Sequence, residues 1–144
     1  PQCGWQIEQG KKTDKLEGKN YQKGFNKLIL SQNNNYQAFM LADIAIALAG
    51  TATEQFVGLG KPVFTFPGKG PQFTYRFAEA QTRLLGISVT LVDKPREIGQ
   101  AVANFLAQPY LAELIAQNGR QRMGLPGAAE RIADYIKSRF RFKG

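Results

Sequence analysis

The sequence predicts an α/β fold, with a Rossmann-like parallel sheet covered by helices on both faces. From Asp43 onward, apolar runs of strand length alternate with longer segments of helical periodicity, and this alternation is typical of βαβ units. The apolar runs are nearly continuous, as expected for strands that are buried on both faces. With 144 residues, 43% of them hydrophobic, the chain is long enough to bury a core as one domain.

The first 26 residues are expected to form a basic, polar N-terminal segment outside this pattern. Trp5 and Ile7 are candidates for a short edge strand, whereas residues 10–20 have the Gly- and Lys-rich composition of a mobile loop. The α/β domain is predicted over residues 27–144. It should begin with a short strand at 27–30 and end in a basic amphipathic helix.

Glycine or proline bounds several of the further elements. Gly60 and Gly86 end two helices, and Pro62 opens a strand at a position where a missing N–H is tolerated. The predicted strands after 27–30 are 44–48, 62–66 and 87–92, and the predicted helices are 36–41, 51–59, 73–85, 95–107, 110–123 and 128–140.

The composition restricts the chemistry. A net charge of +8, with basic residues gathered towards both ends, favours anionic partners such as a nucleotide, a phosphorylated lipid surface or nucleic acid. The chain has no histidine, which removes the usual general base and most zinc sites, so neither a hydrolase of the familiar kinds nor a metal site is expected. The single Cys3 allows no internal disulfide, which suits a reducing cytoplasm.

Two loops follow strands of the predicted sheet, at residues 49–53 and 67–72. Ligands of open α/β sheets bind beyond the carboxyl ends of the strands. The first loop leads directly into a helix, whose free N–H groups and dipole attract an anion. Gly50 would let a phosphate approach closely, and Thr51 and Thr53 would add hydroxyl donors.

Each of these features also has an explanation without a ligand. Thr51 and Glu54 fit a capping box, in which both side chains satisfy donors of their own helix. Lys69 could meet a phosphate or lie in solvent. The polar residues around the next helix start that could serve a hydroxylated ligand, or only the surface, are Gln72, Tyr75, Glu79 and Gln81.

Together these motifs resemble the donor-binding C-terminal half of two-domain GT-B glycosyltransferases. Residues 42–46, 49–53 and 60–63 have that family's pattern of an Ala-Asp strand, a Gly-Thr helix entry and a Gly-x-Pro strand. GTATEQ at 50–55 and GKGPQFTY at 68–75 are similar to the lipid-A-disaccharide synthase-related family. The resemblance runs from about residue 39 to residue 136.

The resemblance implies an inverting glycosyltransferase with a UDP-sugar as donor substrate and no cofactor. It places Gly50, Thr51 and Ala52 at the diphosphate. It also implies a ribose ligand seven residues before the strand proline, which is Gln55 here, with Glu54 as the alternative. The full expected nucleotide-sugar site is Gly50, Thr51, Ala52, Thr53, Glu54, Gln55, Gly68, Lys69, Gln72, Phe73 and Thr74.

The same resemblance implies parts that lie outside this sequence. An N-terminal acceptor domain and the opening strands of the donor domain are expected elsewhere, so the chain alone should not transfer sugar. The expected location is the cytoplasm, with a lipid-linked acceptor or the inner face of the membrane as a further partner. The alternatives are an enzyme like UDP-GlcNAc 2-epimerase and a non-catalytic basic domain that binds anionic lipid. Nucleic acid is the least favoured partner, because the chain has no aromatic and basic RNA-binding motif.

Overall fold

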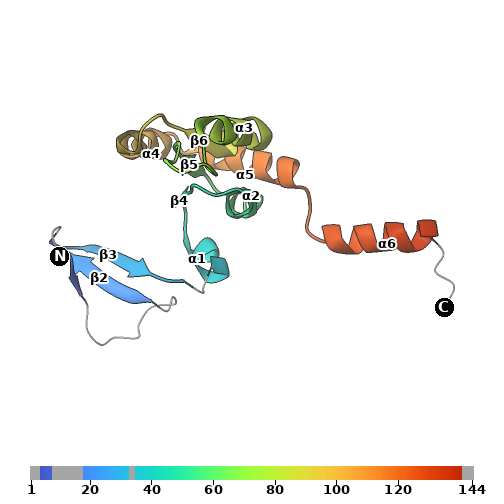
Figure 1. The fold of residues 1–144 in the computed structure, drawn as a ribbon, viewed down its shortest axis with the longest axis horizontal. Helices are drawn as coiled ribbons and strands as arrows, with labels where there is room; N and C mark the ends of the chain where they lie inside the picture. Colours follow the sequence, from blue (N-terminus) through green and yellow to red (C-terminus); the bar gives the residue numbers. More distant parts are fainter. Residues whose placement is uncertain (1–3, 8–17, 33–34, 141–144) are drawn as a thin grey trace. The chain divides into compact units, whose positions relative to one another are not determined.

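The computed structural model describes residues 4–7, 18–32 and 35–140, and the chain divides into two compact units, Pro1–Ala42 and Asp43–Gly144 (Figure 1). The predicted boundary between residues 26 and 27 does not coincide with this division. The boundary between the two units follows residue 42, which is 16 residues after residue 26 (42 minus 26). It lies later because the strand predicted at 27–30 pairs within the first unit.

The first unit contains an antiparallel sheet with strand order β1-β2-β3. Its strands are β1 (Gln6–Ile7), β2 (Lys19–Lys23) and β3 (Asn26–Leu30), and the helix α1 (Asn35–Leu41) follows. Gly24, with a φ of 58°, begins the two-residue turn between β2 and β3, a conformation that favours glycine and matches a tight hairpin. The strand predicted at 27–30 therefore exists, but it is not part of the parallel sheet, since this local turn pairs it with β2.

The second unit contains the parallel sheet, with strand order β4-β5-β6. The strands are β4 (Ala45–Ile46), β5 (Val63–Thr65) and β6 (Val89–Leu91). The helices are α2 (Thr51–Gly58), α3 (Tyr75–Leu85), α4 (Ile98–Leu106), α5 (Tyr110–Met123) and α6 (Ala128–Phe140), and single 3-10 turns lie at Gly86–Ser88 and Pro95–Glu97. The prediction of an α/β fold with a parallel sheet is confirmed for this unit.

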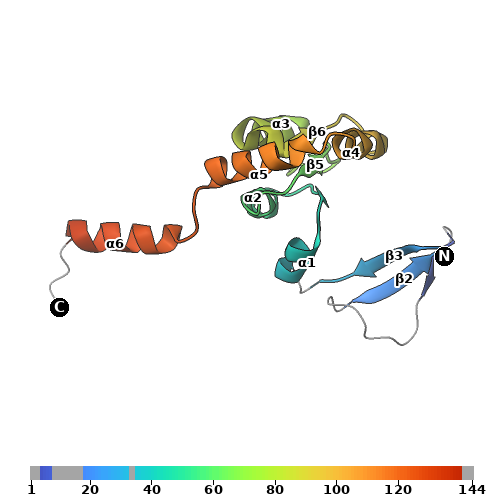
Figure 2. The same cartoon turned by 180° about the vertical axis from the view of Figure 1, so that it is seen from behind.

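Helices cover both sides of the central strand β5. In Figures 1 and 2, β5 and β6 lie between α4 on one side and α2 and α3 on the other. Phe64 meets Phe105 of α4 edge to face, with ring centroids 6.1 Å apart. Its neighbours Val63 and Thr65 are fully buried, and on a strand they face the opposite side.

The strand β4 lies at the edge of the parallel sheet, and here the prediction of burial on both faces is wrong. Ile46 is 59% exposed and Leu48 is 40% exposed. In the described part of the chain, β4 pairs only with β5. An apolar run predicts a buried strand from its composition, but burial also needs a neighbouring strand on each side.

Helix α5 joins the unit through a close approach and a polar network. Gly119 is buried against α2, where a Cβ atom would overlap the carbonyl oxygen of Val57. Asn118 Nδ2 donates to Leu85 O at 2.6 Å and to Ser88 Oγ at 2.7 Å, and Ser88 Oγ donates to Ile115 O at 3.3 Å. The close approach at Gly119 holds α5 against α2, and the polar network holds it against the loop that precedes β6.

Helix α6 has the predicted amphipathic sequence, but no residue of it is buried. Its apolar residues are 40–65% exposed, namely Ile132, Tyr135, Ile136 and Phe140. Among the residues described, this apolar stripe therefore does not pack on the rest of its unit. Among these residues, no helix combines the length and the apolar character that crossing a bilayer requires.

Candidate functional site

The turn between β4 and α2 leaves a row of backbone donors at the start of the helix. Gly50 is the N-cap and has no side-chain capping bond, and Glu54 N donates to Gly50 O at 3.2 Å as the first bond of the helix. The N–H groups of Thr51, Ala52 and Thr53 precede that bond, so no carbonyl of the helix can accept from them.

The predicted capping box is wrong by one position. Such a box needs its hydroxyl residue at the N-cap, but the N-cap is Gly50, and Thr51 is the first helical residue. Thr51 is exposed and Glu54 is half-buried. The alternative without a ligand therefore loses its main support, because Thr51 does not cap α2.

Thr53 is not available as a ligand donor. Its hydroxyl donates to Ala49 O at 2.6 Å, one turn earlier, and the residue is only 1% exposed. A threonine that bonds back to the preceding turn uses its donor within the fold. Of the two hydroxyls predicted in the loop before α2, only that of Thr51 is exposed.

Thr53→Val is expected to destabilise the second unit by about 1 kcal/mol, because the buried side chain keeps its shape but loses a hydrogen bond. Denaturant unfolding followed by circular dichroism measures this. Thr51→Val is the matched control and should leave the free energy of unfolding unchanged, since Thr51 is exposed. Equal stability of the two variants would contradict the role given to the Thr53 hydroxyl.

The loop after β5 is held by bonds of its own. Gly68 N donates to Phe73 O at 2.8 Å, and Thr74 Oγ1 accepts from Phe77 N at 3.3 Å as the N-cap of α3. Phe73 is only 8% exposed and packs against Phe77 with ring centroids 5.3 Å apart. Phe73 and Thr74 are thus occupied in the fold.

The two predicted loops meet at the carboxyl edge of the parallel sheet. Gln81 Nε2 of α3 donates to Gly50 O at 3.2 Å. A Cβ atom on Gly68 would contact Leu48 Cδ2 at 3.4 Å, and a Cβ atom on Gly50 would contact Phe77 Cζ at 3.6 Å. Gly50 was expected to leave space for a phosphate. A Cβ atom at this position would instead point towards the Phe77 side chain, so the space that the glycine leaves lies next to the protein itself.

The predicted residues therefore fall into two groups. Those whose side chains are used inside the fold are Thr53, Phe73 and Thr74, of which Thr74 remains exposed. Those exposed or half-buried around the loops are Gly50, Thr51, Ala52, Glu54, Gln55, Gly68, Lys69 and Gln72. Of the two candidates for the ribose, Gln55 is exposed and Glu54 is half-buried.

Sequence reasoning missed two contributions to this edge. Phe77 was not predicted at all, although its spacing of four from Phe73 is a signal for an aromatic pair. Gln81 was expected either to serve a hydroxylated ligand or to lie on the surface, whereas it is buried and donates to Gly50 O at the N-cap of α2. No local pattern indicates that contact, which joins residues 31 positions apart.

Acidic and metal-ligating side chains do not gather at this edge. Among the residues that the structure describes, no group of three or more His, Cys, Asp or Glu could hold a metal ion. The described site offers backbone donors, amides, a hydroxyl, a lysine and the single carboxylate of Glu54, and this set suits the binding of an anion better than proton transfer.

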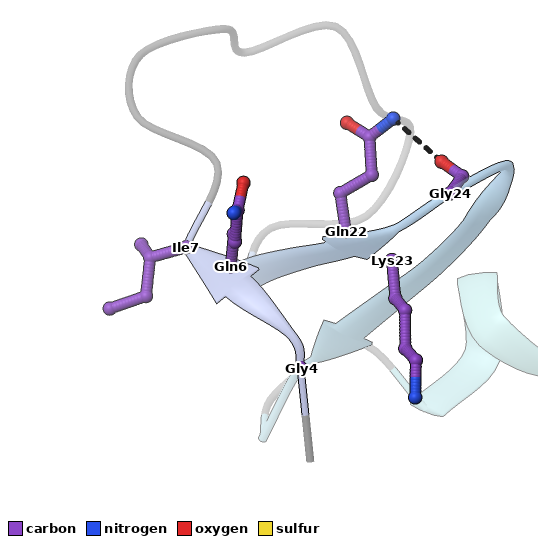
Figure 3. A pocket seen from close by; sticks show the side chains of 6 residues that line it. All are labelled: Gly4, Gln6, Ile7, Gln22, Lys23 and Gly24. Carbon is purple, nitrogen blue, oxygen red and sulfur yellow. Dashed lines mark hydrogen bonds between the residues drawn. The ribbon is translucent and has the colours of Figure 1, made fainter. Parts of the chain in front are cut away.

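A separate hollow of about 390 Å³ lies in the first unit (Figure 3). It is lined by Gly4, Gln6, Ile7, Gln22, Lys23 and Gly24. Gln22 Nε2 donates to Gly24 O at 3.1 Å across its rim, and the side chains of Ile7 and Lys23 point away from each other. None of the predicted site residues lines this hollow.

Comparison of the chain with protein-family models, with curated proteins and with solved structures gave no match. The function therefore has to be inferred from the residues and geometry of the site.

Proposed function

We propose that this chain binds the diphosphate of a UDP-sugar at the N-terminus of α2, as the donor-binding part of an inverting GT-B glycosyltransferase. The observation that carries the proposal is the row of donors at Thr51–Thr53. These N–H groups precede the first helical bond of α2 and stand at the carboxyl edge of the parallel sheet. Helix N-termini at such edges bind phosphate groups through free N–H groups and the helix dipole.

The exposed side chains around this edge provide the remaining contacts of the proposal. Thr51 adds a hydroxyl donor to the diphosphate, and Lys69 and Gln72 extend from the loop after β5. The ribose hydroxyls bind Gln55 or Glu54. When the glycosidic bond of the donor breaks, the same N–H groups stabilise the negative charge on the departing UDP.

The acceptor and the catalytic base belong, in this proposal, to a domain outside the chain. The described residues supply donor binding and charge stabilisation but no paired acid and base. A nucleotide-sugar site of this kind accounts for the exposed donors at both loops.

The two alternatives from the sequence have less support. The sequence from residue 128 to residue 144 carries five basic and two acidic side chains, a net charge of +3 as 5 minus 2. Lipid binding would use that charge and the exposed apolar residues of α6, but it gives no role to the N–H donors at the start of α2. No described feature favours a 2-epimerase.

Calorimetric titration of the full chain with UDP-GlcNAc tests the proposal. Wild type should bind, and Thr51→Val should bind about tenfold more weakly, because a hydrogen bond to a charged phosphate is lost. Thr90→Val is the matched control, since Thr90 is also exposed but lies on β6. Absence of heat with wild type, or equal affinity of all three proteins, would contradict the proposal.

A further inference from the structure

Gln81 is a buried amide that reaches the N-terminal end of α2. It lies in α3, is only 5% exposed, and donates from Nε2 to Gly50 O at 3.2 Å. Its other polar atom, Oε1, is buried and accepts no hydrogen bond from the described residues. Because both atoms belong to one amide group, Oε1 lies at the same end of α2 as the free N–H groups.

The contact with Gly50 holds the peptide that carries the first free donor of the helix. Gly50 O accepts from both Gln81 Nε2 and Glu54 N, each at 3.2 Å. The same planar peptide carries the N–H of Thr51, which points away from that carbonyl. Fixing the carbonyl therefore fixes the direction in which Thr51 N–H points.

No capping side chain of α2 itself performs this task. Gly50 has φ −82° and ψ −85° and no side-chain capping bond. A glycine has more conformational freedom than any other residue, so the peptide after it would otherwise be poorly constrained. Gln81 supplies the constraint from the neighbouring helix.

The unpaired Oε1 points to a ligand as well. A buried acceptor without a donor costs about 1–3 kcal/mol, and native proteins rarely leave one. A bound molecule that places a hydroxyl or N–H group beside its phosphate would satisfy Oε1, as a sugar or nucleoside diphosphate does. An inorganic diphosphate would engage the N–H groups alone.

We infer that Gln81 is a positioning residue of the anion site: it orients Thr51 N–H through Gly50 O, and its Oε1 accepts a hydrogen bond from the bound molecule. The preference for a sugar or nucleoside diphosphate rests on the proposed function. The orientation of the donors concerns any diphosphate.

The test compares Gln81→Glu with wild type in the full chain, by calorimetry with inorganic pyrophosphate and with UDP-GlcNAc at pH 7.5 and pH 5. At pH 7.5 a carboxylate cannot donate to Gly50 O and repels the anion, so the affinity for both ligands should fall more than about tenfold relative to wild type. At pH 5 the buried carboxyl group takes up a proton and donates in place of the amide, and the ratio to wild type should recover to within about threefold. A merely structural role would not produce this recovery.

Two further variants separate charge and folding from positioning. Gln100→Glu adds the same charge on α4, at an exposed glutamine, and should bind like wild type at both pH values. Gln81→Met keeps the length without charge or donor, and should bind both ligands about fivefold to tenfold more weakly with no dependence on pH. If Gln81→Glu does not fold, as seen by circular dichroism, Gln81→Met decides the question.

Each outcome has one meaning. If UDP-GlcNAc binds but the Gln81 variants match Gln100→Glu, the inference about Gln81 is wrong and the proposed function stands. If pyrophosphate shows the loss and recovery but UDP-GlcNAc binds no more tightly than pyrophosphate, the positioning role stands and the proposed function fails. If wild type binds neither ligand, both are wrong.

Discussion

Gly119→Ala is expected to destabilise the second unit by about 3 kcal/mol, because the added methyl group has no space where α5 crosses α2. Its Cβ would overlap the carbonyl oxygen of Val57 and lie 3.3 Å from the Cα of Gly60. Both neighbours are backbone atoms, so no side chain can rotate away. The helices would have to separate, which exposes the buried contacts between them.

Gly99→Ala is the matched control for this prediction. Gly99 lies in α4, and a Cβ there would have no atom within 4 Å. Alanine favours the helix over glycine by up to about 1 kcal/mol, so stability should be unchanged or slightly higher. Urea unfolding of both variants measures the difference, and similar midpoints would show that α5 and α2 are not in this close contact.

Asn118→Leu is expected to cost about 2 kcal/mol, because it removes two hydrogen bonds from a part-buried network. Asn118 Nδ2 donates to Leu85 O at 2.6 Å and to Ser88 Oγ at 2.7 Å. Leucine has a similar size but no donor, so the carbonyl at the end of α3 loses this partner. The loop that leads into β6 should loosen as a result.

Thermal unfolding and amide hydrogen exchange of Asn118→Leu measure this effect. Protection should fall first in β6 and in the Gly86–Ser88 turn. Asn104→Leu is the control, since Asn104 is exposed on α4, and a surface change of this kind stays within about 0.5 kcal/mol. If both variants unfold at the same temperature as wild type, the network does not hold α5.

The helices with local signals at their ends could be predicted closely from the sequence. The predicted helices 110–123 and 128–140 agree with α5 and α6. Gly124, with a φ of 75°, ends α5 where a glycine is expected. Such signals lie within a few residues of the helix end, so they can be found without knowledge of the tertiary fold.

Strand pairing could not be predicted in the same way. The partner of β3 is β2, whose sequence KNYQK has little apolar character, so no alternating pattern pointed to it. The exposed edge of β4 depends on which strands lie beside it, and that is a property of the sheet rather than of residues 44–48.

At the candidate site, the sequence predicted the two loops but not how their side chains are used. Gly50 and Thr51 are adjacent candidates for the N-cap. Because Gly50 occupies that position, the Thr53 side chain is buried and bonds to Ala49 O, and Thr51 is exposed. The contact of Gln81 with Gly50 joins two different helices. Only the tertiary fold of the unit brings Gln81 and Gly50 together.

The central claim is that the N-terminus of α2 binds a sugar nucleotide diphosphate, and amide chemical-shift mapping tests it most directly. UDP-GlcNAc is titrated into the isotope-labelled full chain, and the shift of each backbone amide is followed. The largest shifts are predicted at Thr51, Ala52 and Thr53, with smaller ones in residues 68–72. No shift at these amides, or shifts confined to the hollow between β1 and β2, would contradict the claim.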